Sequence, residues 1–334
     1  KNITFILLFL FLTVQVVWVT KNYLPTNLNN IYEQNFDFIK TSISSLLNYP
    51  LKIFFLLFPF IAVSLVEIIK NFKTDQGRIF KNTSFYRLRK SHGWKFADIW
   101  YFALTIFQGK IPFIALIGTL GIAKYYNSFS DSLNLILNKV LPFSFINNNL
   151  FVIFIFSILL GDCVSYFSHR IAHKYFWELH EFHHSATEMT MFSFYRIGLL
   201  ETFTVEAPIL PFRVLSIILV TKGLSQGDWS IYILYIIYNI VLQMFIHLGH
   251  GSTKVIFPKP LSYIFLSPAL HWLHHSDNPD HFECNFGTIF AFWDRLFGTY
   301  LGEEHLQDIK GYGDPTSEYN KYHPLVCYFV IPFK

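Results

Sequence analysis

The fold of this chain is constrained most by a set of apolar runs, each about as long as a lipid bilayer is thick. The runs cover Ile3–Thr20, Pro50–Ile69, Leu150–Ser168 and Trp229–Leu248. A transmembrane helix needs about 20 mostly apolar residues, because hydrocarbon offers no partners to backbone polar groups. Charged residues make up only 14% of the chain, whereas soluble domains carry about 25%. The sequence therefore predicts an all-α, polytopic membrane helical bundle.

Two further apolar segments have irregular patterns. Asp98–Ala123 is long enough for one crossing, or for a bent hairpin. Leu200–Val220 is interrupted by two charged residues and two prolines, namely Glu206, Pro208, Pro211 and Arg213. Polar groups at membrane depth must face protein or water, so we expect a broken or re-entrant helix in this segment.

Histidine is concentrated in three places along the chain. The first is HRIAHKYFWELHEFHH over His169–His184, the second is the pair His247 and His250, and the third is HWLHH over His271–His275. The basic segment Lys70–Lys95 is expected on the cytoplasmic side of the membrane. Successive single crossings from that segment return all three histidine groups to the cytoplasmic face, whereas a hairpin within Asp98–Ala123 would break this agreement.

The spacing of these histidines is typical of metal ligands. Side chains at i and i+4 of a helix share a face, so two such imidazoles can bind one ion. The pattern HxxHH occurs twice, and its adjacent histidines point about 100° apart, which directs them toward two different ions. Neutral imidazole suits iron, zinc or copper, and the pattern therefore predicts a two-metal site. If the helix runs on, one stripe joins Asp162, Tyr166, His169, His173, His180 and His184.

Other interpretations of the histidines stay open at this point. HEFHH over His180–His184 matches HExxH, in which Glu181 would be the general base of a zinc-dependent membrane hydrolase or protease. A non-enzymatic metal-binding or transport protein is another alternative. A transporter would need its ligands at mid-membrane, whereas these histidines lie at the ends of the apolar runs. Bis-histidine haem needs single histidines deep in facing spans. Cys163, Cys284 and Cys327 are too widely spaced for a disulfide framework or a thiolate zinc site, which favours a reducing compartment.

The motifs HRIAH, HEFHHS and HWLHHS, followed by ECNFG and FWDRLFGTY, resemble the fatty acid hydroxylase/sterol desaturase superfamily. The resemblance covers about Asp162–Gly302. It implies a helical membrane enzyme with a cytosol-facing, histidine-rich dimetal cap and dioxygen-dependent hydroxylation or desaturation of a lipid, with ether-lipid oxidation equally open. We accordingly expect an N-terminal transmembrane region at 1–123, a connector at 124–149, a catalytic domain at 150–302 and a C-terminal tail at 303–334.

The resemblance also implies roles for individual residues. Asp162 and Asn285 match family positions that support the ligands, and His281 is either a ligand or, as we expect, a supporting residue. Arg196 and the basic segment Lys70–Lys95 are both candidate contacts for an anionic lipid head group. Many relatives carry a histidine in a stretch like RFHPLE, where this chain has Gly198 within Arg196–Glu201. The implied metal ligands are His169, His173, His180, His183, His184, His247, His250, His271, His274 and His275.

The implied cofactors are two iron ions, for which zinc can substitute on purification, with dioxygen as co-substrate. The lipid substrate would enter from the bilayer of the bacterial inner membrane or the endoplasmic reticulum. The chain has no GxGxxG motif and no cysteine set for an iron–sulfur cluster, so we expect a separate electron donor resembling cytochrome b5, a ferredoxin or a reductase. The net charge of +4 is too small to indicate a nucleic acid partner.

Overall fold

The structure is a computed structural model of the 334-residue chain. It describes residues 50–74, 80, 82–91, 96–110, 149–198, 229–314 and 316–329, with scattered positions between 201 and 223. The expected span Ile3–Thr20 and all but the last residue of the expected connector lie outside these ranges. The chain divides into two compact units, and the unit formed by Leu57–Thr105 and Asn149–Lys334 contains all of the clustered histidines.

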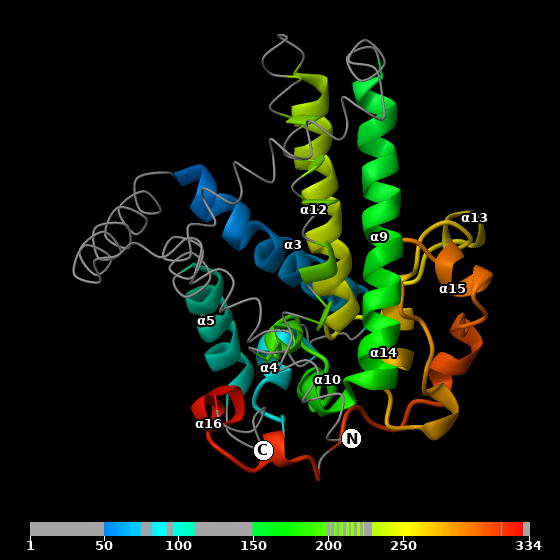
Figure 1. Cartoon of the computed structure of the whole chain (residues 1–334). Helices are drawn as coiled ribbons and strands as arrows, with labels where there is room; N and C mark the ends of the chain where they lie inside the picture. The colour runs from blue at the N-terminus through cyan, green and yellow to red at the C-terminus, as the bar shows by residue number, and fades with distance from the viewer. Residues whose placement is uncertain are drawn as a thin grey trace, which may run out of the picture. The chain divides into compact units, whose positions relative to one another are not determined.

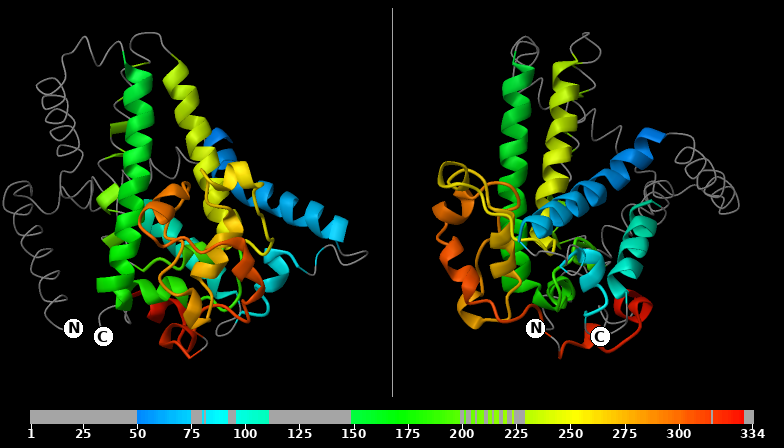
Figure 2. Two further views of the ribbon diagram at one scale, coloured as in Figure 1. Left: turned by 90° about the vertical axis from the view of Figure 1, so that its right-hand side faces the viewer. Right: turned by 180° about the vertical axis from the view of Figure 1, so that it is seen from behind.

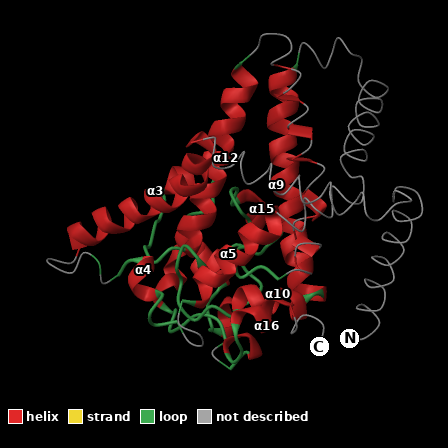
Figure 3. Ribbon diagram, turned by 90° about the vertical axis from the view of Figure 1, so that its left-hand side faces the viewer, coloured by secondary structure: helices red, strands yellow, loops and turns green. Residues whose placement is uncertain are grey.

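Every regular element in the described ranges is a helix, joined by irregular loops (Figure 3). Apart from helices, these ranges contain isolated bridges, between Phe265 and Phe290 and between Ser276 and Tyr312. The all-α prediction is thus confirmed. The α-helices are α3 (Pro50–Thr74), α4 (Ser84–Arg87), α5 (Ala97–Lys110), α9 (Leu150–Tyr175), α10 (Trp177–His184), α12 (Ser230–His250), α13 (Lys259–Ser262), α14 (His271–His274), α15 (Phe292–Leu296) and α16 (Pro324–Phe329).

Two of these helices, α9 and α12, are long and apolar enough to cross a membrane. They run side by side, and both enter the histidine-rich region at their C-terminal ends (Figures 1 and 2). Large apolar side chains on both helices are exposed, including Phe151 and Phe156 on α9 and Ile233 and Ile237 on α12. Such contiguous apolar surface is typical of helices that face lipid rather than water. The protein is therefore a membrane protein in which these two helices match the predicted spans.

The expected broken helix at Leu200–Val220 is described only in part. Its described positions include the 3₁₀ helix η3, Ala207–Ile209, which contains Pro208. Proline removes a backbone donor and fixes φ, so a regular α-helix is interrupted at such a position. Ser216 of this segment lies beside Ser157 of α9, with the two hydroxyl oxygens 3.3 Å apart.

The first histidine stretch does not form the single continuous helix on which the predicted stripe depended. Helix α9 ends at Tyr175, and Phe176 has non-helical backbone angles of φ −130° and ψ 32° before α10 begins. The amide of Phe176 still donates to the carbonyl of Ala172, which closes the last turn of α9. The break turns α10 back against the end of α9, so residues eleven apart in sequence face each other.

A buried carboxylate fastens α3 to the end of α12. Glu67 is fully buried and accepts hydrogen bonds from the backbone and hydroxyl groups of both Ser84 and Ser252. The bond from the Ser252 amide to Oε1 of Glu67 measures 3.0 Å, and that from the hydroxyl measures 2.8 Å. Because Ser252 follows His250 by two residues, this contact fixes the point where α12 delivers its last histidine.

The segment after the third histidine group folds around two aspartates. Asp162 accepts from the amides of Ile289 and Phe290 and from the indole of Trp293, at 3.3, 3.4 and 3.1 Å. Asp294 accepts from the amides of Phe286 and Gly287 at 2.8 and 2.9 Å, and from the hydroxyl of Thr299 at 2.7 Å. These bonds hold the ECNFG and WDRLFGT motifs against α9.

Candidate metal centre

Nine of the ten histidines predicted as ligands gather into two groups. In each group, one potential ligand atom from every member lies within 4.8 Å of those from all the others. The five-histidine cluster contains His169, His173, His180, His184 and His274. The four-histidine cluster contains His183, His250, His271 and His275.

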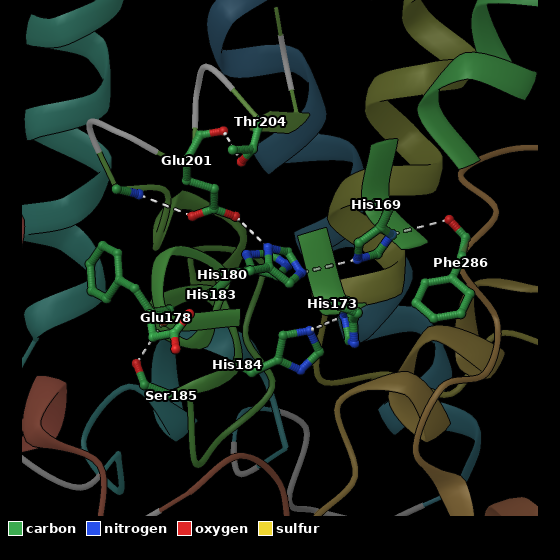
Figure 4. Close-up of polar contacts among 12 residues, drawn as sticks. His169, His173, Glu178, His180, His183, His184, Ser185, Glu201, Thr204 and Phe286 are labelled. Carbon is green, nitrogen blue, oxygen red and sulfur yellow. Dashed lines mark hydrogen bonds and ion pairs between the residues drawn. The ribbon is translucent and has the colours of Figure 1, made fainter. Parts of the chain in front are cut away.

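The five-histidine cluster is built where α10 turns back on α9 (Figure 4). The Nε2 atoms of His169 and His180 lie 3.1 Å apart, and those of His173 and His184 are also 3.1 Å apart. From α14, His274 adds its ring at 4.5 Å from that of His169. Three helices from two regions of the sequence thus supply one cluster.

The four-histidine cluster joins α10, α12 and α14 through the Nε2 atoms of its members. Nε2 of His250 lies 3.1 Å from that of His183 and 3.2 Å from that of His271. Nε2 of His271 is in turn 3.0 Å from that of His275. Two imidazoles bound to one ion at about 2.1 Å would have nitrogens about 3.0–3.4 Å apart, so these spacings suit a shared ion.

Each HxxHH motif contributes to both clusters. His180 and His184 belong to the five-histidine cluster, whereas His183 between them belongs to the other. The second motif is divided the opposite way, with His274 in the five-histidine cluster and His271 and His275 in the four-histidine cluster. The stacked rings of His184 and His275, with centroids 4.3 Å apart, bring the two clusters into contact. The division agrees with the angular separation of adjacent helical residues.

Several rings are oriented by acceptors at Nδ1, which leaves Nε2 for the cluster. Nδ1 of His180 donates to Oε1 of Glu201 at 2.6 Å, and Nδ1 of His169 to the carbonyl of Phe286 at 3.1 Å (Figure 4). Nδ1 of His274 donates to the carbonyl of Cys284 at 2.8 Å. An acceptor at one nitrogen fixes the tautomer and directs the lone pair of the other toward a metal.

Burial keeps the clustered imidazoles neutral. It lowers the pKa of His180, His183 and His184 well below 6.5, and neighbouring imidazoles lower each pKa further. The same causes lower the pKa of His271, His274 and His275. Neutral imidazole is the form that binds metals, and it suits iron and zinc.

Some ring nitrogens in the clusters have no hydrogen-bond partner within the described ranges. They are Nδ1 of His183, Nε2 of His274 and Nδ1 of His275. Buried polar atoms are normally paired, and the Nε2 of His274 faces a group of other potential ligand atoms. The donor set, its neutrality and its spacing therefore fit a metal centre.

The structure does not bring His247, the tenth predicted ligand, into either cluster. Its Nδ1 lies 2.8 Å from the carbonyl of Gln243, and its Nε2 lies 3.0 Å from the hydroxyl of Tyr195. Although one helical turn separates it from His250, the angular offset of three residues turns its ring toward Tyr195. We therefore leave His247 out of the proposed ligand set.

The three residues expected to support the ligands make contacts that differ from one to the next. Asp162 contacts the loop at 289–293 and has no described hydrogen bond to a clustered histidine. Asn285 lies between the two carbonyls that orient His274 and His169, and its φ of 52° is in the left-handed region. Its side chain bonds to backbone groups of Leu270 and Leu301, so it supports the site by holding its loop. His281 lies instead in a third group of potential ligands.

Arg196, the candidate head-group contact, is a buried structural residue. It is 1% exposed, and its Nε donates to Oδ1 of Asp98 at 2.7 Å. Its remaining nitrogens donate to Ser185, Asn320 and Ser91. These contacts join α5, the end of α10 and the C-terminal segment, so the guanidinium is held by groups of the protein itself.

Sequence reasoning missed Glu201, whose Oε1 lies 2.6 Å from Nδ1 of His180 in the five-histidine cluster. Glu201 is buried, and besides holding His180 it accepts from the amide of Gly198 through Oε2 at 3.1 Å. The stretch Arg196–Glu201, which resembles RFHPLE, held a signal for it, since its last residue is a glutamate. Gly198 replaces the histidine of that pattern and contributes its backbone amide.

The HExxH interpretation is not favoured by the orientation of its glutamate. Oε1 of Glu181 accepts from the hydroxyl of Ser317 at 2.8 Å, in the C-terminal segment. A general base must reach the metal-bound reactants, and this contact directs the carboxylate elsewhere. His180 and His184 do share a cluster, but three more imidazoles join them there.

The fold and the site together define a class: helical membrane metalloproteins whose histidine boxes form two adjoining clusters at the ends of the spans. Residues 154–299 match the model of the fatty acid hydroxylase family. This confirms the family resemblance found in the sequence.

Several curated relatives are similar to about half of the chain, and the chain spans less than half of the length of each. Alkylglycerol monooxygenase of Caenorhabditis elegans is 28% identical over 177 residues, which are 52% of this chain and 32% of that protein. The human alkylglycerol monooxygenase is 28% identical over 44% of this chain and 31% of its own length. Ornithine lipid hydroxylase of Rhizobium tropici is 24% identical, covering 43% of this chain and 42% of that protein. No solved structure matches the chain.

Proposed function

We propose that this protein is an integral membrane oxygenase that uses two iron ions, dioxygen and external electrons to oxidise a C–H bond of a lipid. The observation that carries the proposal is the pair of adjoining all-imidazole clusters at the ends of two bilayer-length helices. The match of residues 154–299 to the fatty acid hydroxylase family supports the same chemistry. The five-histidine cluster would hold one iron and the four-histidine cluster the other.

When bound, the two irons would supply an oxidant strong enough for an unactivated C–H bond, which no amino-acid side chain provides. The chain contributes the cage. Glu201 and the carbonyls of Cys284 and Phe286 fix three ring orientations, and burial keeps the imidazoles neutral. Exclusion of water by the surrounding aromatic side chains protects the reaction from side processes.

The proposed substrate is a membrane lipid whose alkyl chain reaches the clusters along α9 and α12. The names of the relatives point to ether lipids and amino-acid lipids as substrate classes. In the proposed reaction one C–H bond is broken, one oxygen atom enters as a hydroxyl, and the other leaves as water with two protons and two electrons. A desaturase would begin with the same hydrogen abstraction, so desaturation is the alternative outcome.

The proposal places the clusters on the cytoplasmic side, as the basic segment Lys70–Lys95 predicts. A separate donor there would deliver the two electrons, and a cytochrome b5-like, ferredoxin-like or reductase-like protein has suitable chemistry. The zinc-hydrolase alternative would need no electrons and no dioxygen, so it predicts lipid cleavage that continues when dioxygen is removed.

Lipid mass spectrometry under ¹⁸O-labelled dioxygen tests the proposal. Cells that make the full chain are compared with cells that make His274→Ala, and with His323→Ala as a control outside both clusters. We expect a lipid carrying one ¹⁸O atom, or a lipid two hydrogens lighter, only with the intact chain and the control. Products that persist in His274→Ala, or lipid cleavage that continues without dioxygen, would contradict the oxygenase.

A further inference from the structure

A third group of potential metal ligands lies outside the two clusters. It consists of His281, His305 and Asp308, each of which has one potential ligand atom within 4.8 Å of those of the other two. His281 ends the 3₁₀ helix η5, Pro279–His281, and His305 lies in η6, Glu303–Gln307, with Asp308 directly after it. Two imidazoles and a carboxylate are a frequent ligand set for zinc.

The buried member of this group has an unpaired nitrogen. His281 is 1% exposed, and its Nδ1 has no hydrogen-bond partner in the described part of the chain. Its Nε2 lies 3.4 Å from the side-chain nitrogen of Asn278, at the limit of hydrogen-bond distance. A buried imidazole is normally satisfied at both nitrogens, so Nδ1 is the atom left for a ligand.

The other two members form a surface pair that by itself would need no metal. Nδ1 of His305 lies 3.5 Å from Oδ2 of Asp308, and both side chains are more than 40% exposed. A pair at i and i+3 on a helix surface is common and contributes little to stability. It does not explain why the buried ring of His281, with a free nitrogen, lies beside it. Oε1 of the exposed Glu304 lies 4.0 Å from Nε2 of His305 and is a further carboxylate within reach.

This third group lies at the two ends of the chain segment that orients two histidines of the five-histidine cluster. The segment from His281 to Asp308 includes the carbonyls of Cys284 and Phe286, which orient His274 and His169. An ion held by His281 and by the pair at 305 and 308 would close this segment into a loop at its base. Closing a loop through a metal restricts its conformations in the way that a covalent cross-link does.

We propose that His281, His305 and Asp308 form a third metal site, for one divalent cation of the zinc class, that fastens the loop carrying Cys284 and Phe286. Nδ1 of His281 is its buried ligand, and water completes the coordination on the exposed side. Because two of its ligands are half-exposed, the ion exchanges with solvent more readily than ions in the buried clusters. The site is independent of the proposed oxygenase chemistry.

The test is the zinc content of the purified full-length protein in detergent after dialysis against chelator-buffered zinc. We expect His305→Ala and Asp308→Asn each to hold one zinc ion fewer per chain than the intact protein, which holds three. His305→Cys should hold as many zinc ions as the intact protein, because a thiolate also binds zinc. His323→Ala, a histidine outside the group, should change nothing. The surface variants are preferred to changes at His281, whose burial would mix metal loss with misfolding.

A second readout follows the loop itself. Zinc should slow proteolytic cleavage within 282–302 in the intact protein and in His305→Cys, and should have no such effect in His305→Ala. Equal zinc content in the intact protein and His305→Ala would overturn the third site, whatever the state of the two clusters. If the intact protein oxidises no lipid but still holds one zinc ion more than His305→Ala, only the oxygenase proposal is refuted.

Discussion

The two histidine clusters share their boxes but differ in how their rings are oriented. In the five-histidine cluster, His180, His169 and His274 donate to Glu201 and to two loop carbonyls, all from elsewhere in the chain. In the four-histidine cluster, Nδ1 of His250 bonds to the carbonyl of Ile246 in its own helix at 2.9 Å.

Two other members of the four-histidine cluster, His183 and His275, have Nδ1 atoms without a partner in the described ranges. The rings of the five-histidine cluster are therefore oriented by tertiary contacts, and those of the four-histidine cluster by the placement of helices α10, α12 and α14. Because of this difference, a substitution outside the ligands should change the metal affinity of one cluster more than that of the other.

Removing one ligand from either cluster should have the largest effect. We expect His169→Ala and His271→Ala each to lower lipid oxidation more than about 100-fold, beyond the roughly 10–100-fold typical for residues that only support ligands. Iron analysis of the purified variants, beside His323→Ala as control, measures the loss. Full activity in either variant would remove that histidine from the proposed ligands.

Acid should release metal and destabilise the clusters together. The folded-state pKa of His183, His184 and His275 lies well below 6.5, so below that pH the unfolded chain binds more protons than the folded one.

Each such histidine should therefore lower the free energy of unfolding of the metal-free protein as the pH falls below about 6.5, by up to about 1.4 kcal/mol per pH unit. Thermal unfolding between pH 7 and pH 5 measures this slope. A stability that rises on acidification would show that the folded state carries charged imidazoles.

Glu201→Ala should weaken the five-histidine cluster selectively. Without Glu201, His180 loses the acceptor that fixes its tautomer, and metal affinity should fall about 10–100-fold. Glu201→Gln keeps an acceptor oxygen and should recover part of the loss. Exposed Glu318→Gln, outside all three groups of potential ligands, serves as the control. Equal loss of both ions in Glu201→Ala, measured by metal titration, would count against separate control of the clusters.

Glu67→Gln should act on the four-histidine cluster, with the smallest effect of these changes. The amide retains one acceptor but loses the charge that holds Ser84 and Ser252, which should lower stability by about 1–3 kcal/mol. Because Ser252 follows His250, the weaker-bound ion should be that of the four-histidine cluster. Thermal unfolding and metal titration test this, and an unchanged midpoint would show that the α3 contact is dispensable.

Local patterns in the sequence were sufficient for the helical fold, the two apolar helices and the division of each HxxHH between clusters. These depend on helical periodicity, which a sequence carries directly. The break at Phe176 depends on α10 packing against α9, and no glycine or proline marks it. The ion pair of Arg196 with Asp98 and the contact of His247 with Tyr195 could not be predicted, because they arise only in three dimensions. The stretch Arg196–Glu201 pointed to Glu201, but which histidine it contacts is decided only by the fold.

The shared boxes have a consequence for how metals enter and leave. His183 and His184 are adjacent on α10, and His274 and His275 are adjacent at the end of α14, yet each pair serves both clusters. An ion in one cluster therefore orders the backbone that presents ligands to the other. The first ion should therefore raise the affinity of the other cluster for the second ion, because it has already met part of the ordering cost.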